Sequence, residues 1–187
     1  MRLNMYFLAA QSFCAAVSGQ TTTDRVVYIL HDEAKHSWCG YLNKEQWTSD
    51  LGRADADITG YLEYSQARLS QVNLREAAVT GDWVVDDKYT VSPKGELTEL
   101  KRVISYYSEN EQRRQQFDLR EGKGKLVDSS IIDLKTGRPL EVPRLNSKFD
   151  TWPLFVRFTD FPFKALLRQV DKAQSTGVHC VSVASER

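Results

Sequence analysis

The chain has 187 residues, a length that suits one domain with a sizeable core. Its 25 basic and 25 acidic residues give a formal net charge of zero, so the composition offers no support for binding nucleic acid or an anionic membrane, which favour basic surfaces. Hydrophobic residues make up 41% and charged residues 27%, the composition of a folded domain rather than a disordered chain.

The N-terminal segment has the layout of a secretory signal peptide. Arg2 precedes an uncharged, mostly apolar run over residues 5–17, and small residues ending in Gly19 follow. The run is shorter than the roughly 20 apolar residues that cross a membrane. We therefore predict a signal peptide over residues 1–19, an exported protein (periplasmic or extracellular), and one β-rich domain over residues 20–187 without a transmembrane segment. The alternative is that the N-terminal segment forms the first strand or helix of the fold.

Two cysteines remain if the signal peptide is removed, Cys39 and Cys180, one near each end of the domain. In an oxidising compartment such a pair can form a disulfide, and two cysteines allow only one intramolecular pairing. Two free thiols are the alternative, because a disulfide also requires the two Cα atoms to lie within about 7 Å.

The first part of the domain predicts two strands and a helix. Residues 25–31 are β-branched and aromatic without a breaker, which indicates a strand, and residues 37–42 form a short return strand. A short helix is expected to begin near Asn43, with Glu45 in its first turn. Residues 50–57 are interpreted as a surface loop.

The segment from 58 to 140 is divided by turn-forming residues at nearly even steps, among them Gly81, Gly95, Asn110 and Gly137. Glycine and asparagine tolerate the positive φ of tight hairpins. The intervening segments are rich in Val, Ile, Leu, Tyr and Phe. We predict a mainly β fold, in which a long antiparallel meander forms a twisted sheet or an incomplete barrel.

Two strands of the meander carry charges on apolar faces. In residues 82–92 apolar and polar side chains alternate, as in a strand with one packed and one wet face, and Asp87 falls on the apolar side. Residues 96–108 do not keep one phase, and a β-bulge near residues 98–99 would restore it. Arg102 would then also face the apolar side.

The last two strands of the meander are less regular. Residues 112–116 are polar on both faces, which predicts a projecting hairpin tip, an edge, or a strand that faces a wet groove. Residues 125–135 place Leu126 and Ile132 on one face, interrupted by Asp128.

After the meander, prolines mark irregular chain. Residues 154–161 are interpreted as a short aromatic strand. Residues 162–172 predict an amphipathic helix that begins at Pro162, with Asp160 as a nearby cap, and packs on the sheet. Residues 178–184 form a final strand. The apolar stripe of the helix consists of Phe163, Leu166, Leu167 and Val170.

The segment 31–39 concentrates two histidines, two carboxylates and a cysteine. Each of these side chains can bind a transition metal, which makes His31 and His36 weak candidate ligands. Their spacing does not put both rings on one helical face, so the alternative is a solvated turn, and we predict no metal and no cofactor. Cys39 close to His36 also allows a nucleophile and a base.

Two sets of residues are candidates for ligand binding. The first set is charged and lies on apolar faces: Asp87, Arg102 and Asp128. A lone charge facing a core is costly, so the alternative is a structural cross-strand pair of Asp87 with Arg102. The second set is aromatic and either fills the core or lines an apolar pocket; it includes Trp152, Phe155 and Phe158.

The chain contains none of the common catalytic or nucleotide-binding motifs. Our first hypothesis is an exported, non-enzymatic protein that binds a protein, a peptide or a lipid-like ligand on a curved sheet. The alternative is a secreted or periplasmic hydrolase that uses His31, His36 or Asp87.

Overall fold

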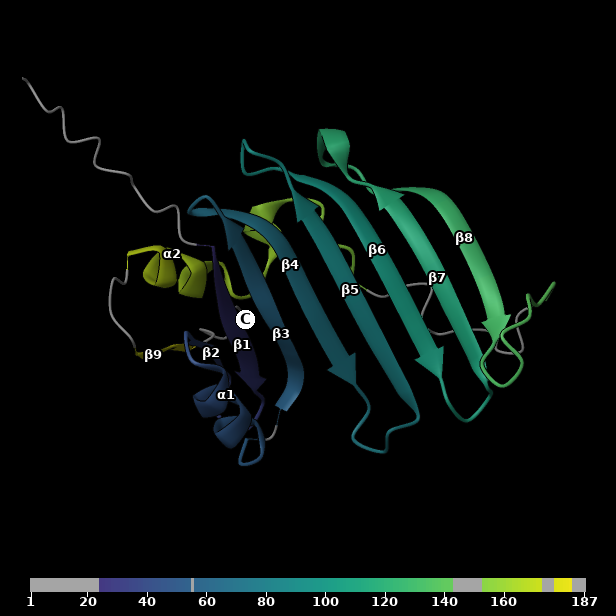
Figure 1. The fold of residues 1–187 in the computed structure, drawn as a ribbon, viewed down its shortest axis with the longest axis horizontal. Helices are drawn as coiled ribbons and strands as arrows, with labels where there is room; N and C mark the ends of the chain where they lie inside the picture. The colour runs from purple at the N-terminus through teal and green to yellow at the C-terminus, as the bar shows by residue number, and fades with distance from the viewer. Residues whose placement is uncertain (1–23, 55, 143–152, 173–176, 183–187) are drawn as a thin grey trace, which may run out of the picture.

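The computed structural model describes residues 24–54, 56–142, 153–172 and 177–182. Within these residues, nine antiparallel strands form one sheet with two α-helices beside it (Figure 1). The helices are α1 (Lys44–Leu51) and α2 (Lys164–Lys172), and two short 3-10 helices are η1 (Arg120–Gly122) and η3 (Phe158–Asp160). The strands are β1 (Arg25–Asp32), β2 (Ser37–Tyr41), β3 (Ala56–Ser65), β4 (Arg68–Ala77), β5 (Trp83–Val91), β6 (Leu97–Tyr106), β7 (Glu111–Asp118), β8 (Lys125–Asp133) and β9 (Val178–Ser182).

The strand order is β8-β7-β6-β5-β4-β3-β1-β2-β9. From β3 to β8 each strand pairs with the next one in the sequence, which confirms the predicted meander. In the described part of the chain, β8 and β9 lie at opposite edges and do not pair with each other, so the sheet is open. The mainly β fold is therefore confirmed.

The β3–β4 hairpin shows how local chemistry sets the strand pairing. Its two central residues, Gln66 and Ala67, have φ values of 51° and 60°. Two consecutive positive φ values give a type I′ turn, whose twist matches that of the flanking strands. The β5–β6 hairpin instead uses Gly95, with φ of 81°, where the missing Cβ removes the steric cost.

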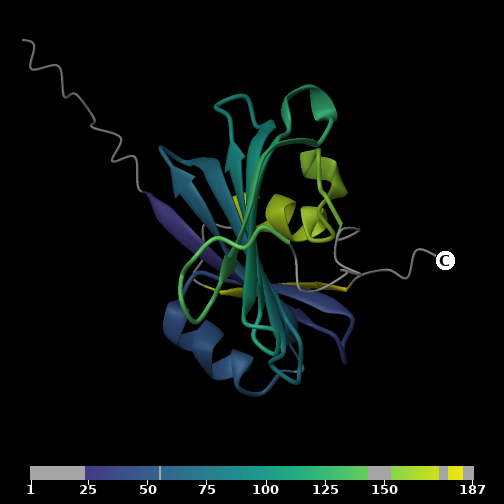
Figure 2. The ribbon, with the colours of Figure 1, turned by 90° about the vertical axis from the view of Figure 1, so that its right-hand side faces the viewer.

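The two α-helices cover opposite faces of the sheet (Figure 2). We call the face that carries α2 the inner face, and the face that carries α1 the outer face. The predicted apolar stripe of α2 is buried in the inner-face core. Gly40 of β2 permits this approach, because a Cβ there would lie 3.3 Å from side-chain carbons of Leu166 and Val170. Burying each such leucine or valine stabilises the fold by about 1.5–3 kcal/mol.

The predicted bulge in β6 is confirmed. Thr90 pairs with Glu99 and Val91 pairs with Leu97, so Thr98 is the extra residue. The bulge brings Arg102 to the inner face, where it lies directly opposite Asp87.

The segment before α2 differs from its prediction. Residues 154–157 are irregular rather than a strand, and η3 follows them. The carboxylate of Asp160 accepts hydrogen bonds from the N–H groups of Val156 and Arg157, at 3.2 and 2.9 Å. Those two N–H groups are therefore paired by a side chain instead of a neighbouring strand. Asp160 does not cap α2, which begins at Lys164, two residues after the expected start.

Two other boundaries also differ. Helix α1 begins after Asn43 as predicted, since the Asn43 side chain accepts a hydrogen bond from the Gln46 N–H. The following loop is shorter than the predicted 50–57, because α1 continues to Leu51 and β3 begins at Ala56.

Strand β7 is neither a hairpin tip nor an edge, because it pairs with β6 on one side and β8 on the other. Its inner-face residues include Glu111 and Arg113, which are buried and joined by a hydrogen bond of 2.6 Å. The Arg113 guanidinium also lies 5.6 Å from the centre of the Tyr106 ring. Pairing among polar side chains thus allows a polar sequence to form an interior strand.

A disulfide joins Cys39 of β2 to Cys180 of β9, the pairing that the sequence offered for the domain after residue 19. The two residues are direct cross-strand partners, with their Cα atoms 4.1 Å apart. The bridge ties the C-terminal edge strand to the rest of the sheet. None of the described helices has the length and apolar character needed to cross a membrane.

Candidate functional site

The predicted ligand residues Asp87 and Arg102 form a buried ion pair on the inner face. Two Arg102 nitrogens donate to the two Asp87 oxygens, both at 2.7 Å, and Arg102 also donates to the Pro153 carbonyl at 2.7 Å. Burial raises the pKa of Asp87, and the two hydrogen bonds from Arg102 oppose that rise. The two charges therefore compensate each other, and Arg102 also anchors the C-terminal segment. This is the cross-strand pair of Asp87 with Arg102 that was the alternative to ligand binding.

Asp128 does not join this pair. It lies opposite Gln116 on the outer face, whereas Arg102 is on the inner face. A register shift between β7 and β8 makes Val127 an extra residue, which moves Asp128 to the other face from Leu126. The predicted shared face of Leu126 and Asp128 is therefore wrong. Trp152 lies outside the described residues.

The aromatic residues fill the inner face rather than lining an empty barrel. Phe161 and Phe163 are fully buried and their rings stack at 4.9 Å between centroids. Phe155 packs against Phe161 at 5.1 Å and near Tyr89 at 6.3 Å, whereas Phe158 contacts Phe161 from its edge at 5.7 Å. A cavity of about 90 Å³ remains beside Phe155 and Phe163, which is too small for a lipid-like ligand.

Glu76 of β4 lines this small cavity together with Asp87. Burial and, to a smaller extent, the nearby carboxylates of Asp57 and Asp87 raise the pKa of Glu76, Arg102 opposes the rise, and the resulting pKa is about 7. The sequence alone did not single out Glu76. Its spacing of two and four residues from Leu74 and Val72 along β4 was nevertheless a signal that all three side chains face inward.

We expect Glu76→Gln to remove a pH dependence of stability. The pKa in the folded state is above the ordinary value of 4.5, so stability is full below pH 4.5 and declines as the pH rises to about 7. Allowing for partial solvent exposure, the variant should be about 1–2 kcal/mol more stable than the wild type at pH 8 and equally stable at pH 4.5. Urea unfolding at both pH values measures this difference. The exposed Glu45→Gln serves as the control, and a Glu76→Gln variant that matches the wild type at pH 8 would refute the prediction.

The histidine cluster does not assemble a metal site. His31 Nδ1 lies 2.6 Å from Asp57 Oδ1 and its ring packs against Trp38, whereas His36 is exposed in the turn after β1. Among the described residues no group of three or more potential ligands could hold a metal ion. The Cys39 sulfur is part of the disulfide, so it does not provide the thiol that the hydrolase interpretation considered beside His36.

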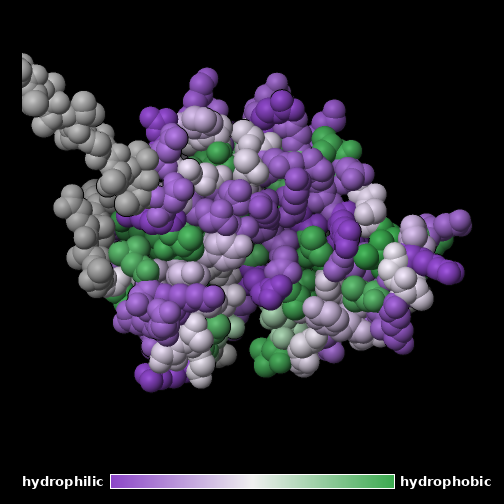
Figure 3. Space-filling model, viewed as in Figure 1, coloured by the Kyte–Doolittle hydropathy of each residue, from purple (hydrophilic) through white to green (hydrophobic). Residues whose placement is uncertain are grey.

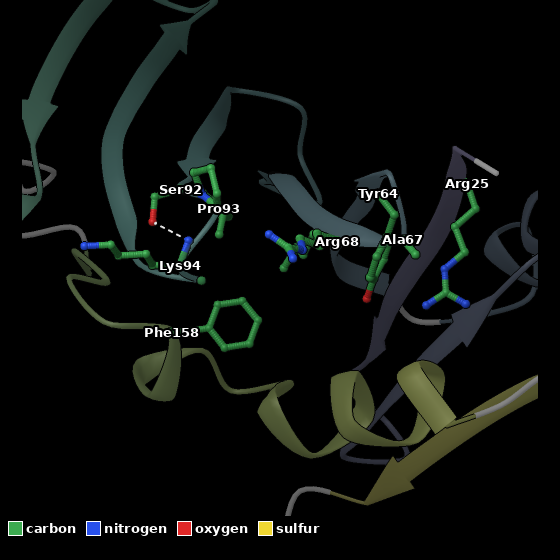
Figure 4. Close-up of a pocket in the computed structure, with 11 residues that line it drawn as sticks. Arg25, Tyr64, Ala67, Arg68, Ser92, Pro93, Lys94 and Phe158 are labelled. Atoms are coloured by element: carbon green, nitrogen blue, oxygen red, sulfur yellow. Dashed lines mark hydrogen bonds between the residues drawn. The ribbon is translucent and has the colours of Figure 1, made fainter. Parts of the chain in front are cut away.

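A larger pocket lies at the end of the inner face where the β3–β4 and β5–β6 hairpins turn (Figure 4). We call it the end pocket; its volume is about 640 Å³, within the range of small-molecule sites. Phe158 of η3 closes it on the side away from the sheet. Its apolar walls are Tyr64, Leu69, Val91 and Phe158.

The charged residues of the end pocket are all basic. Arg25, Arg68 and Lys94 line it, and no acidic residue does so among the described residues. The Arg25 guanidinium lies over the Tyr64 ring, 4.3 Å from its centre, which holds a positive charge against an apolar wall. Arg68 is exposed and makes no ion pair within the described part of the chain. In Figure 4 the Arg68 side chain extends into the pocket, whereas the Lys94 ammonium points away from it.

Backbone geometry fixes the rim of the end pocket. The Ser92 hydroxyl accepts hydrogen bonds from the N–H groups of Lys94 and Glu96, at 3.3 and 3.2 Å. This side-chain capping, with the positive φ of Gly95, holds the β5–β6 turn beside Arg68. The sequence predicted only a turn at Gly95 in this region, because the pocket appears only when two hairpins and η3 meet in space.

Asp87 and Arg102 thus pair with each other on the inner face, Phe155 packs against the core, Phe158 lines the end pocket, and Asp128 lies on the outer face. No protein family, curated protein or solved structure matches this chain.

Proposed function

We propose that the chain is an exported, non-enzymatic binding protein, and that its end pocket binds a small lipid-like molecule with an anionic head group and an apolar body. The observation that carries this proposal is a pocket of about 640 Å³ that combines two arginines, Arg25 and Arg68, with apolar walls and contains no acidic residue among its lining residues. The formal net charge of the chain is zero, so the positive charge of the pocket is a local excess.

The two parts of the ligand would have different partners. Arg68 offers a planar set of donors that suits a carboxylate or phosphate, and Arg25 adds a second positive charge above Tyr64. The apolar body would lie along Leu69, Val91 and Phe158. The Ser92 hydroxyl is engaged with backbone N–H groups, and the pocket lining contains no histidine or carboxylate to serve as a general base, which supports binding rather than catalysis.

Export is part of the proposal and has two supports. The segment 1–19 has the pattern of a signal peptide, and the Cys39–Cys180 disulfide is compatible with an oxidising compartment. Sequencing the N-terminus of the protein recovered from an expressing cell tests this part, and a mature chain that begins near Gln20 would support it.

We expect the purified protein to bind dodecanoate, and Arg68→Gln to weaken this binding about tenfold, because a hydrogen-bonded charge partner of the head group is lost. Isothermal titration calorimetry below the micelle concentration measures both affinities. Dodecyltrimethylammonium has the same apolar chain with a cationic head, so it should bind much more weakly.

The matched control is Arg53→Gln, which removes an exposed arginine that lines a different surface region, next to α1. It should bind dodecanoate like the wild type. Equal affinity for the anionic and cationic amphiphiles, or an equal loss in both arginine variants, would contradict the proposed function.

A further inference from the structure

The outer face of the sheet carries a second recess, separate from the end pocket. It begins at Trp47 of α1 and crosses the strands β3, β4, β5 and β6, with a volume of about 490 Å³. Figure 3 shows hydrophilic residues gathered over the middle strands on this face. We call this recess the outer groove and define it by its side chains that face outward: Trp47, Thr59, Tyr61, Asn73, Arg75, Asp86, Lys88, Lys101 and Val103.

Strand pairing arranges these side chains in rows across the sheet. One row runs from Tyr61 through Asn73 and Lys88 to Lys101, each residue directly opposite the next. Neighbouring strands lie about 4.8 Å apart, so the row presents an aromatic ring, an amide and two ammonium groups at regular steps. A linear ligand could therefore contact several of these groups at once.

The two lysines of this row place like charges next to each other. Lys88 and Lys101 are direct cross-strand partners, and like charges in that position repel each other. Lys101 has one distant partner, Glu99, at 3.7 Å, and Lys88 makes no ion pair in the described part of the chain. An anionic group that lies between the two ammonium groups would remove this repulsion.

The other polar groups of the outer groove suit hydroxyl groups. Arg75 and Asp86 form a bidentate pair at 2.7 and 2.9 Å, and their side chains keep 62% and 40% of their surface exposed. The pair therefore presents further acceptors and donors close together. Asn73 adds an amide beside them; within the described residues its side chain makes one hydrogen bond, a long one of 3.5 Å to Glu63.

Aromatic rings complete the recess. Tyr61 is 40% exposed on the outer face. The Trp47 indole is held in place, because its N–H donates to the Ile29 carbonyl at 3.2 Å and its ring packs on Tyr28 at 5.3 Å. A fixed aromatic surface next to planar polar groups is suited to a ring with apolar faces and a polar rim.

A peptide fits this recess less well. The strands that form its floor are interior strands whose backbone groups are paired on both sides, so an added strand could not form backbone hydrogen bonds there. A ligand in the outer groove must therefore be recognised by side chains, because the backbone groups of these strands are already paired. A chain of hydroxylated rings with carboxylates matches the aromatic, amide and ammonium groups of the row.

We propose that the outer groove binds an acidic oligosaccharide. A carboxylate of the sugar lies between Lys88 and Lys101, a sugar ring stacks on Tyr61, and hydroxyl groups contact Asn73 and the Arg75–Asp86 pair. The proposal is independent of the end pocket, which is lined by other residues at the hairpin turns of the inner face.

Calorimetric titration with tetragalacturonic acid tests this proposal, with maltotetraose as a neutral sugar and tetraglutamate as an acidic peptide. We expect the acidic sugar to bind best, and the affinity to fall as salt is raised because ammonium–carboxylate contacts are screened. Lys88→Gln and Tyr61→Ala should each weaken binding about fivefold to tenfold. Lys164→Gln on the exposed side of α2 is the control and should have no effect.

Three results would overturn the proposal. Tetraglutamate that binds as tightly as the acidic sugar would mean that the outer groove recognises charge only. Maltotetraose that binds equally well would show that the lysine pair has no role. Absence of binding by a wild-type protein that unfolds cooperatively would show that the outer groove is not a sugar site.

Discussion

Arg102→Met is expected to lower the free energy of unfolding by about 3–5 kcal/mol, because it leaves the Asp87 carboxylate buried without its cation. Asp87 is 7% exposed and Arg102 is 3% exposed, so water cannot replace the lost partner. The variant also loses the hydrogen bond from Arg102 to the Pro153 carbonyl, which connects the sheet to the C-terminal segment. Urea unfolding followed by circular dichroism measures the change.

The outer face provides a matched control for this variant. Arg75 and Asp86 form the same bidentate pair on the neighbouring strands β4 and β5, but both side chains are exposed. Arg75→Met should therefore cost less than about 1 kcal/mol. A double variant with Asp87→Leu and Arg102→Met should recover most of the lost stability, since it leaves no unpaired charge. If Arg102→Met and Arg75→Met lower the free energy of unfolding equally, the claim that burial makes the Asp87–Arg102 pair more important is wrong.

Replacing both Cys39 and Cys180 with alanine is expected to lower the free energy of unfolding by about 3–5 kcal/mol. The two cysteines are 141 residues apart, so the bridge closes a long loop and restricts the unfolded chain. It also holds the edge strand β9, whose only partner in the described part of the sheet is β2.

Reduction provides the control for the disulfide variant. Dithiothreitol should destabilise the wild type to the level of the double variant and should leave the double variant unchanged. Wild-type stability that is the same with and without reductant would mean that the bridge does not stabilise the fold.

Much of the sheet could be predicted because its signals are local. Alternation in β5 identified the inner face and placed Asp87 on it, and the phase break in β6 identified the bulge that brings Arg102 beside it. The apolar stripe from Phe163, just before α2, to Val170 was equally clear, since apolar spacing determines which helical face is buried.

The errors arose where specific side-chain contacts and strand pairing, rather than residue periodicity, decide the structure. Residues 154–157 have a strand-like composition, but the Asp160 carboxylate and the Arg102 guanidinium hold the backbone of this segment in an irregular form. The polar strand β7 is interior because Glu111 and Arg113 pair with each other, which no periodicity indicates. The bulge at Val127 reversed the face of Asp128 because it depends on the pairing with β7.

The candidate sites were harder to predict than the fold. The charged pair and the aromatic cluster stood out in the sequence because they break a pattern, yet the structure uses Asp87, Arg102 and Phe155 to close the core. The end pocket combines Phe158 with Arg25 and Arg68, two arginines that are remote from it in sequence and ordinary in their local context. Only the packing of η3 against two hairpin turns brings them together.

The most direct test of the end pocket as the ligand site is an NMR titration of the isotope-labelled protein with dodecanoate. Proposed binding at the end pocket predicts that the largest amide shift changes occur at the two hairpin turns, at Ala67, Arg68, Lys94 and Gly95. Changes centred instead on Tyr61 and Lys88 of the outer groove, or an absence of changes at the hairpin turns, would contradict the proposed ligand site.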